Sequence, residues 1–160
     1  MENLVYTFLD HFGLEYEVVK HPAVYTVEEA DRYIEGKEGG RTKSLFLTNR
    51  KKTQFYLVII EDSKRLDMNH LGLLLGTKGL RFASSESLMQ KMSLTPGSVS
   101  IFGLLHNEEK DIKVYIDKTL LSYQRLTFHP NTNTKTIFVN TQDLLSLIEE
   151  IGFTYEVLSL

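Results

Sequence analysis

The chain has 160 residues, of which 42% are hydrophobic and 24% charged, and its formal net charge is −3. This charge argues against extensive non-specific binding along a nucleic-acid backbone, although a small basic rim can still grip one nucleic-acid end. Cysteine is absent, which excludes disulfides and cysteine metal sites, and no apolar run approaches the roughly 20 residues of a membrane span. We therefore expect one cytoplasmic domain over residues 1–160, without a secretory signal.

The N-terminal segments predict a helix, a strand and a second helix. Apolar residues at helical spacing indicate a first helix over 5–12, which Gly13 ends. Residues 15–20 are typical of a short strand. Thr26 is expected to begin the second helix, because Glu29 follows three residues later in the capping-box position.

Strands and helices are interspersed through the rest of the chain. The expected strands are 42–48, 55–60, 80–83, 112–116, 125–129, 136–139 and 154–158. The expected helices are 66–75, one from Ser84 or Ser85 to Met92, a short one near Leu120, and one that Thr141 caps and Gly152 ends. Because the order is not strictly βαβ, we expect an α+β (mixed α/β) fold with a single mixed sheet and flanking helices.

The stretch 94–107, LTPGSVSIFGLLHN, combines glycines with residues that are too apolar for a solvated loop. Gly97 suits a tight turn, because glycine accepts a positive φ at no steric cost. Ile101 and Phe102 should hold the stretch against the body of the protein. Two interpretations remain open at this point: an ordinary turn leading into a core strand, or a loop whose backbone N–H groups bind a ligand.

Two other segments present polar groups, again with two interpretations each. Lys43 shares a strand face with Leu45 and Leu47, so it either snorkels to solvent or points into a pocket to bind an anion. The segment 128–136, FHPNTNTKT, either makes its own tight turn or displays amide and hydroxyl groups to a polar ligand. His129 in this segment is either structural or part of a site. The five histidines show no metal-ligand spacing, and we expect neither a metal nor another cofactor.

Four segments together resemble the YbaK and prolyl-tRNA-synthetase-associated editing-domain family, most closely its free-standing prolyl-tRNA editing branch. They are KHPAVYTVEEA (20–30), RTKSLFL (41–47), PGSVSIFGLL (96–105) and FHPNTNTKT (128–136). The resemblance implies a mixed sheet with flanking helices and hydrolysis of the ester of wrongly charged tRNA. The family loop has glycine, three residues and proline, whereas Ile101 stands at the proline position here. We expect Ile101→Pro to maintain or raise activity and to stabilise the protein slightly.

The resemblance also implies roles for individual residues. Lys43 would hold the phosphate of the terminal adenosine, and N–H groups of the glycine loop would orient water or stabilise the oxyanion. The ribose 2′-hydroxyl of the substrate would assist the water. The expected catalytic residues are Lys43, Gly97, Ser98, Val99 and Ser100. The expected substrate-binding residues are His129, Asn131, Asn133, Thr134, Ile101, Phe102 and Gly103.

The activity that this resemblance implies is trans-editing: removal of alanine from mischarged tRNA for proline. One alternative is removal of cysteine from the same tRNA. Another is a catalytically silent module of the same fold that binds the tRNA acceptor end or an amino acid. The expected partner is the acceptor end of aminoacyl-tRNA, with prolyl-tRNA synthetase or another translation factor as a further candidate. Membranes and DNA are not expected partners.

Overall fold

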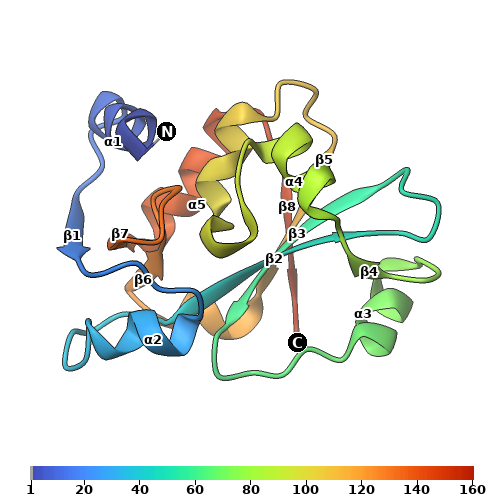
Figure 1. Cartoon of the computed structure of the whole chain (residues 1–160), viewed down its shortest axis with the longest axis horizontal. Coiled ribbons are helices and arrows are strands. Elements are labelled where there is room, and N and C mark those ends of the chain that lie inside the picture. The colour runs from blue at the N-terminus through green and yellow to red at the C-terminus, as the bar shows by residue number, and fades with distance from the viewer. Residues whose placement is uncertain (1) are drawn as a thin grey trace.

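Two β-sheets form the framework of the computed structural model, which describes residues 2–160 (Figure 1). The strands are β1 (Tyr16–Lys20), β2 (Thr42–Thr48), β3 (Phe55–Glu61), β4 (Arg81–Phe82), β5 (Ile112–Asp117), β6 (Arg125–Phe128), β7 (Lys135–Asn140) and β8 (Tyr155–Leu158). One sheet has the order β1-β7-β6 and is antiparallel. The other has the order β4-β2-β3-β5-β8, antiparallel from β4 to β3 and parallel from β3 to β8.

The two sheets meet at one junction, where residues 40–42 lie beside residues 125–127. Gly40 pairs in parallel with Leu126, and the Thr127 N–H donates to the Gly40 carbonyl at 3.0 Å. Next to this pair, Thr42 donates its hydroxyl to the Thr127 carbonyl. The pairing does not continue into a ladder, so the sheets stay separate. The mixed α+β class is confirmed, whereas the prediction of a single sheet is wrong. Periodicity in a sequence indicates where strands lie but not which strands pair with one another.

Helices cover these sheets on several sides. They are α1 (Glu2–His11), α2 (Val27–Arg32), α3 (Met68–Leu75), α4 (Ser85–Met92) and α5 (Thr141–Glu150), with 3₁₀ turns η1 (Pro96–Ser98), η2 (Ile101–His106) and η3 (Lys118–Ser122). The larger core joins α1, α4, α5 and η2 to both sheets. A smaller core lies on the other face of the five-stranded sheet, under α3. Within residues 2–160, no helix has the length and apolar character needed to cross a bilayer.

Side chains that accept from backbone N–H groups set the start of several helices. Thr26 and Ser84 each accept a bond from the N–H three residues later, at 3.2 and 3.1 Å, which confirms both as caps. At α5 the cap is Asn140, which accepts at 3.1 Å, and not Thr141 as predicted. The Thr141 hydroxyl instead donates to the Tyr123 carbonyl at 2.7 Å, because Thr141 is already helical and faces the interior.

The stretch 94–107 lies against the larger core, as its composition predicts. Ile101, Phe102 and Leu104 are at most 3% exposed. Gly103 allows this packing, since a Cβ at that position would lie 2.5 Å from the Cε of Met92 on α4. The stretch is therefore held in place by its own apolar side chains.

The predicted positive φ at Gly97 is wrong. Gly97 is not among the glycines of residues 2–160 with positive φ. Pro96 instead begins the 3₁₀ turn η1, and the Ser98 N–H donates to the Thr95 carbonyl at 2.9 Å. Proline pre-sets the backbone for such a turn, so the glycine does not need a left-handed conformation here.

Ile101→Pro tests the backbone of this stretch. Ile101 is the first residue of η2, and Ser100 before it has φ −155° and ψ 154°, a conformation that a following proline accepts. Because Ile101 is buried, the lost side-chain volume offsets the gain of about 0.4–1 kcal/mol from a stiffer unfolded chain. We expect the free energy of unfolding to stay within about 1 kcal/mol of the wild type, measured by urea titration.

Ile101→Ala is the matched control, because it removes side-chain volume without restricting the backbone. It should cost about 2–5 kcal/mol. A proline variant as unstable as the alanine variant would show that residue 101 has a conformation that proline cannot adopt.

Candidate functional site

Four segments that are far apart in the sequence meet at one cavity of about 210 Å³. They are the segment before α2, the start of β2, the loop that contains η1, and the end of β6. Of the predicted site residues, Lys43, Gly97, Val99 and His129 line it. The other lining residues are Val24, Tyr25, Thr26, Thr42, Ser44, Leu45, Pro96 and Phe128.

Lys43 supplies the positive charge of this cavity. It lies on the same face of β2 as Leu45 and Leu47, and Leu47 is buried in the smaller core. The side chain of Lys43 is half-buried and forms no ion pair or hydrogen bond with any residue from 2 to 160. The strand thus holds an ammonium group at the cavity without committing it to a carboxylate.

The loop over the cavity contributes backbone more than side chains. Gly97 and Val99 line the cavity, and their N–H groups have no acceptor in the described part of the chain. Ser98 and Ser100 are buried and do not line it. The Ser100 hydroxyl accepts a bond from the Phe102 N–H at 3.1 Å, so it caps η2. Of the four loop residues predicted as catalytic, Gly97 and Val99 reach the cavity, whereas Ser98 and Ser100 do not.

His129 lines the cavity as a neutral ring. Its Nδ1 lies 3.2 Å from the carbonyl oxygen of Lys135, so Nδ1 carries the proton of this bond, since a carbonyl can only accept. Burial lowers the pKa of His129, the bond to Lys135 opposes this, and the neighbouring His21 lowers it slightly further. The ring is consequently held in one tautomer and uncharged near neutral pH.

The loop after His129 supports the cavity from behind. Asn133 donates from Nδ2 to the Val24 carbonyl at 3.0 Å, and the Val24 N–H returns a bond to Asn133 at 3.1 Å. The Thr134 carbonyl accepts from the His21 N–H at 2.9 Å. Both residues therefore position the segment 21–24, and neither lines the cavity.

Asn131 is different from its neighbours. It is 7% exposed, and neither its Oδ1 nor its Nδ2 has a hydrogen-bond partner among residues 2–160. It does not line the cavity, although its backbone N–H bonds to the carbonyl of His129 at 2.9 Å. An uncommitted buried amide so close to the site leaves its predicted substrate contact as a proposal.

Ile101, Phe102 and Gly103 do not reach the cavity, although they were predicted to bind substrate. Their place is the larger core, where the Phe102 ring meets that of Phe128 edge-on with centroids 5.9 Å apart. Phe128 in turn lines the cavity. The three residues therefore act on the site through packing and do not line the cavity.

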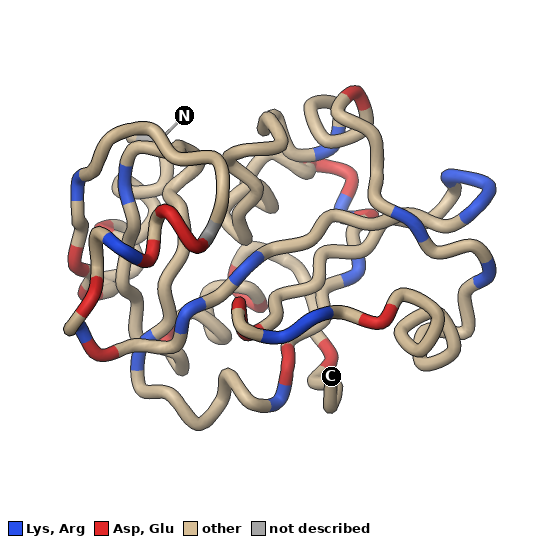
Figure 2. Tube along the Cα trace, turned by 60° about the horizontal axis from the view of Figure 1, so that its bottom comes forward, with Lys and Arg blue, Asp and Glu red and all other residues tan. Residues whose placement is uncertain are grey.

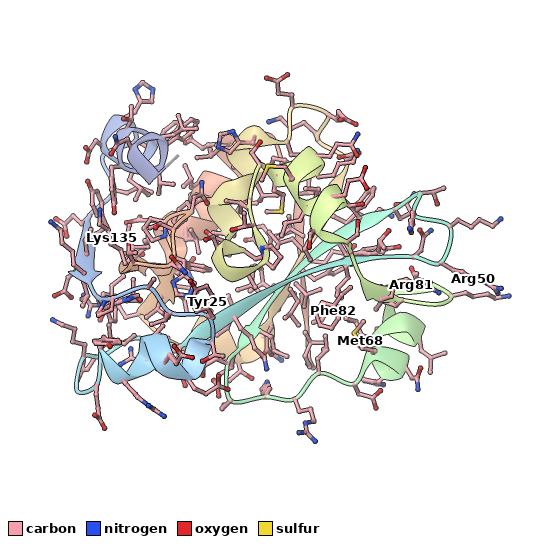
Figure 3. The ribbon with its side chains drawn as sticks, in the orientation of Figure 1. Tyr25, Arg50, Met68, Arg81, Phe82 and Lys135 are labelled. Carbon is pink, nitrogen blue, oxygen red and sulfur yellow. The ribbon has the colours of Figure 1, made fainter. Side chains whose placement is uncertain are left out.

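Tyr25 is the most prominent lining residue that the sequence reasoning did not select. Its side chain is 77% exposed, and a Cβ on Gly97 would lie 3.7 Å from its ring. Figure 3 shows it on the segment before α2, over the start of β2. The segment KHPAVYTVEEA was part of the family resemblance, and this was the signal that could have identified it.

A larger cavity, of about 760 Å³, lies elsewhere, between β1, β6 and the loop after α2. The two cations that line it are already paired, because Glu17 binds Lys37 at 2.8 Å and Arg125 at 3.0 Å. The pKa of Glu17 is lowered by these two bonds. The smaller cavity has the uncommitted cation and backbone donors, and is therefore the better candidate.

A model of the aminoacyl-tRNA editing domain matches residues 21–147. The chain belongs to the aminoacyl-tRNA editing domain family. The family resemblance inferred from four segments is thereby confirmed. No group of three His, Cys, Asp or Glu side chains within residues 2–160 of this editing domain is arranged to hold a metal ion.

Relatives of this editing domain cover nearly its whole length. Prolyl-tRNA editing protein ProX of Acetoanaerobium sticklandii is 32% identical over 152 residues, which cover 95% of this chain and 93% of that protein. Prolyl-tRNA synthetase associated domain-containing protein 1 of Mus musculus is 30% identical over 148 residues, covering 90% and 87%. A crystal structure of a candidate trans-editing enzyme for prolyl tRNA synthetase matches with a TM-score of 0.77 at 24% identity, covering 99% and 95%. At this identity the structural match shows the fold alone.

Two carboxyl groups, those of Asp31 and Asp62, lie together beside the site. Asp31 on α2 lines a small hollow together with Thr42 and His129, and its carboxyl group is close enough to that of Asp62 for one proton to be held between them. Burial and the neighbouring carboxyl group of Asp62 together raise the pKa of Asp31 to about 8, while Arg41 opposes the shift. Two carboxylates cannot form a hydrogen bond unless one is protonated, so the proton ties α2 to the end of β3.

This pair predicts a pH dependence of stability in the editing domain. The folded state keeps a proton on Asp31 that the unfolded chain releases above about pH 4, so stability from the pair is lost as pH rises through about 8. Asp31→Asn replaces the acid with a neutral side chain of similar shape. Its free energy of unfolding should therefore fall less than that of the wild type between pH 5 and pH 8.5, measured by urea titration.

The difference between the two pH curves removes contributions that both proteins share, including that of His129. Glu35→Gln, at an exposed position, is the control and should follow the wild type. Parallel curves for the wild type and Asp31→Asn would show that the pair holds no proton near neutral pH.

Proposed function

We propose that this editing domain is a trans-editing hydrolase that removes alanine from mischarged tRNA for proline. The observation that carries the proposal is the convergence of Lys43, the Gly97 loop and His129 on one small cavity. Family membership supports an aminoacyl ester as the substrate. The relatives named for prolyl-tRNA editing support the tRNA for proline.

Lys43 binds the phosphate of the terminal adenosine in this proposal. A compact ammonium group suits a single phosphate, and this one has no carboxylate partner among the described residues. The chain as a whole is slightly acidic, so a local cation at the cavity mouth is needed to attract an anionic strand end. Lys43 thereby fixes where the ester lies relative to the loop.

The loop supplies the electrostatic stabilisation. An aminoacyl ester is already activated, so its hydrolysis needs a positioned water and donors for the developing oxyanion, which the N–H groups of Gly97 and Val99 provide. The water oxygen bonds to the carbonyl carbon, and the bond from that carbon to the ribose oxygen breaks. The water proton passes to the ribose oxygen with help from the adjacent ribose hydroxyl. The products are alanine and uncharged tRNA.

The size of the cavity selects the amino acid. Val24, Val99 and Phe128 form apolar walls around a volume of about 210 Å³, and the neutral ring of His129 completes them. In this proposal the ester and its ribose fill part of the volume, so that the space left between the walls takes an alanine methyl group but not the proline ring. The amide of Asn131 is buried next to His129 and is available to a polar group of the substrate.

A deacylation assay on three substrates tests this function. We expect rapid release of alanine from alanyl-tRNA for proline, slower release of cysteine, and protection of correctly charged prolyl-tRNA. Activity should persist after treatment with a chelator of transition metals, because the proposed chemistry uses backbone donors and a lysine. Binding of tRNA without any release of amino acid would instead support a silent module, and activity restored only by zinc would contradict the mechanism.

Lys43→Ala should lower kcat/KM for alanyl-tRNA about 10- to 150-fold, because a hydrogen bond to a charged group contributes about 1.5–3 kcal/mol. The melting temperature should barely change, since Lys43 is not part of the core. Lys113→Ala, at an exposed position of β5, is the matched control and should keep full activity. A folded Lys43→Ala protein with wild-type kcat/KM would show that Lys43 does not bind the substrate.

A further inference from the structure

A second hollow of about 380 Å³ begins where the candidate site ends. Lys43 and Leu45 line both, so the two hollows are neighbours along β2. The rest of its lining is Glu28, Asp62, Ser63, Lys64, Arg65, Leu66, Met68 and Phe82. We call this second hollow the Phe82 groove. Neither the sequence analysis nor the proposed function assigns it a role.

Phe82 gives the groove an exposed aromatic surface. It is 62% exposed on the two-residue strand β4, directly opposite Leu47 of β2. Paired residues on neighbouring strands project to the same face, so Phe82 lies on the face of Lys43. Figure 3 shows Phe82 and Met68 close together below β2. The core does not require an aromatic ring in so exposed a position.

Basic side chains continue from the groove toward the β2–β3 hairpin. Arg65 borders the groove, and the exposed cations of the hairpin, of the loop before β4 and of β4 itself follow. They are Arg50, Lys51, Lys52, Lys78 and Arg81. None of these six forms an ion pair with another residue from 2 to 160. Figure 2 shows Lys and Arg positions gathered at this hairpin and beside it.

We propose that the Phe82 groove binds the unpaired nucleotides that precede the terminal adenosine of tRNA, with a base stacked on Phe82 and the paired stem against the basic hairpin. This inference rests on the proposed function. A strand whose last phosphate lies at Lys43 has to leave the cavity, and the groove continues it on the other side of that lysine. An aromatic platform bordered by uncompensated cations is the usual means of holding single-stranded nucleic acid.

The path along β2 from Lys43 to the hairpin is long enough for an unpaired strand end. Lys43 lies five positions before the end of β2, a distance of about 17 Å at about 3.3 Å per residue. The unpaired end therefore lies along the strand before the double-stranded stem reaches the hairpin. Glu28 and Asp62 also border the groove, and they disfavour a phosphate directly beside them.

Substrates of different length separate this groove from the catalytic cavity. Base stacking contributes about 1–3 kcal/mol per base, so Phe82→Ala should lower kcat/KM for alanyl-tRNA roughly 5- to 150-fold. The same variant should hydrolyse alanyl-adenosine, which lacks the preceding nucleotides, at the wild-type rate. Phe82→Trp should keep activity on both substrates. Leu73→Ala, at an 82% exposed apolar position of α3, is the control and should change neither.

Binding of uncharged RNA tests the groove without catalysis. A hairpin RNA with the unpaired 3′ nucleotides should bind the wild type more tightly than the same hairpin without them, and Phe82→Ala should remove that difference. Replacing Arg50 and Lys51 by Gln should reduce the dependence of log Kd on log salt by about one unit per contact. The control pair, Lys113→Gln with Lys118→Gln, should leave this slope unchanged.

The outcomes distinguish the two proposals. A wild type that binds the hairpin RNA through Phe82 but hydrolyses neither substrate contradicts the proposed function alone. Hydrolysis of both substrates with no effect of Phe82→Ala on tRNA overturns the groove, as does an equal loss on tRNA and on alanyl-adenosine. If Phe82→Ala has no effect on tRNA, the exposed ring of Phe82 would instead be a candidate contact for a protein partner.

Discussion

The candidate site depends on the junction between the two sheets. At this junction the Gly40 N–H donates to the Arg125 carbonyl at 2.8 Å, and the Gly40 carbonyl accepts from the Thr127 N–H. Two residues later, the Thr42 hydroxyl donates to the Thr127 carbonyl. A side chain at residue 40 would meet the ring of Tyr123 at 2.6 Å, so only glycine lets the strands come this close. The junction sets β2 beside β6, and this brings Lys43 and His129 to one cavity.

The loop on the other side of the cavity is fixed by a different force. Ile101, Phe102 and Leu104 bury their side chains in the larger core, and Gly103 lets η2 approach Met92 closely. Apolar burial thus anchors one end of the loop, which leaves the segment around Gly97 free to present its backbone. Hydrogen bonds therefore position the cation, and hydrophobic packing positions the donors.

Local sequence signals predicted the elements better than their assembly. The apolar run of β3 and the cap Thr26 follow from patterns within a few residues, and the structure has both. The two-sheet arrangement depends on the contact between Gly40 and Leu126, which are 86 positions apart, and no local pattern contains it. The same limit explains Gly97, where the composition indicated a turn and the preceding proline decided its type.

The site was predictable only where chemistry and family resemblance coincide. Lys43 and His129 carry distinctive groups in matching segments, and both line the cavity. The resemblance also selected Phe102 because of its place in the motif, but a motif does not distinguish a residue that contacts a ligand from one that packs behind it. The resemblance also covered Tyr25, in the segment KHPAVYTVEEA, but it implied no role for any residue of that segment, so Tyr25 was not predicted.

The alternation of side chains along β2 has a consequence for how this chain tolerates changes in length. The loop 35–38 is exposed and precedes the junction, so extra residues there can be accommodated without moving Lys43. One residue inserted between Thr42 and Lys43 would turn the lysine to the opposite face of the sheet, among the side chains of the larger core. The loop therefore tolerates a change of length, whereas Gly40, Thr42 and Lys43 require a fixed spacing.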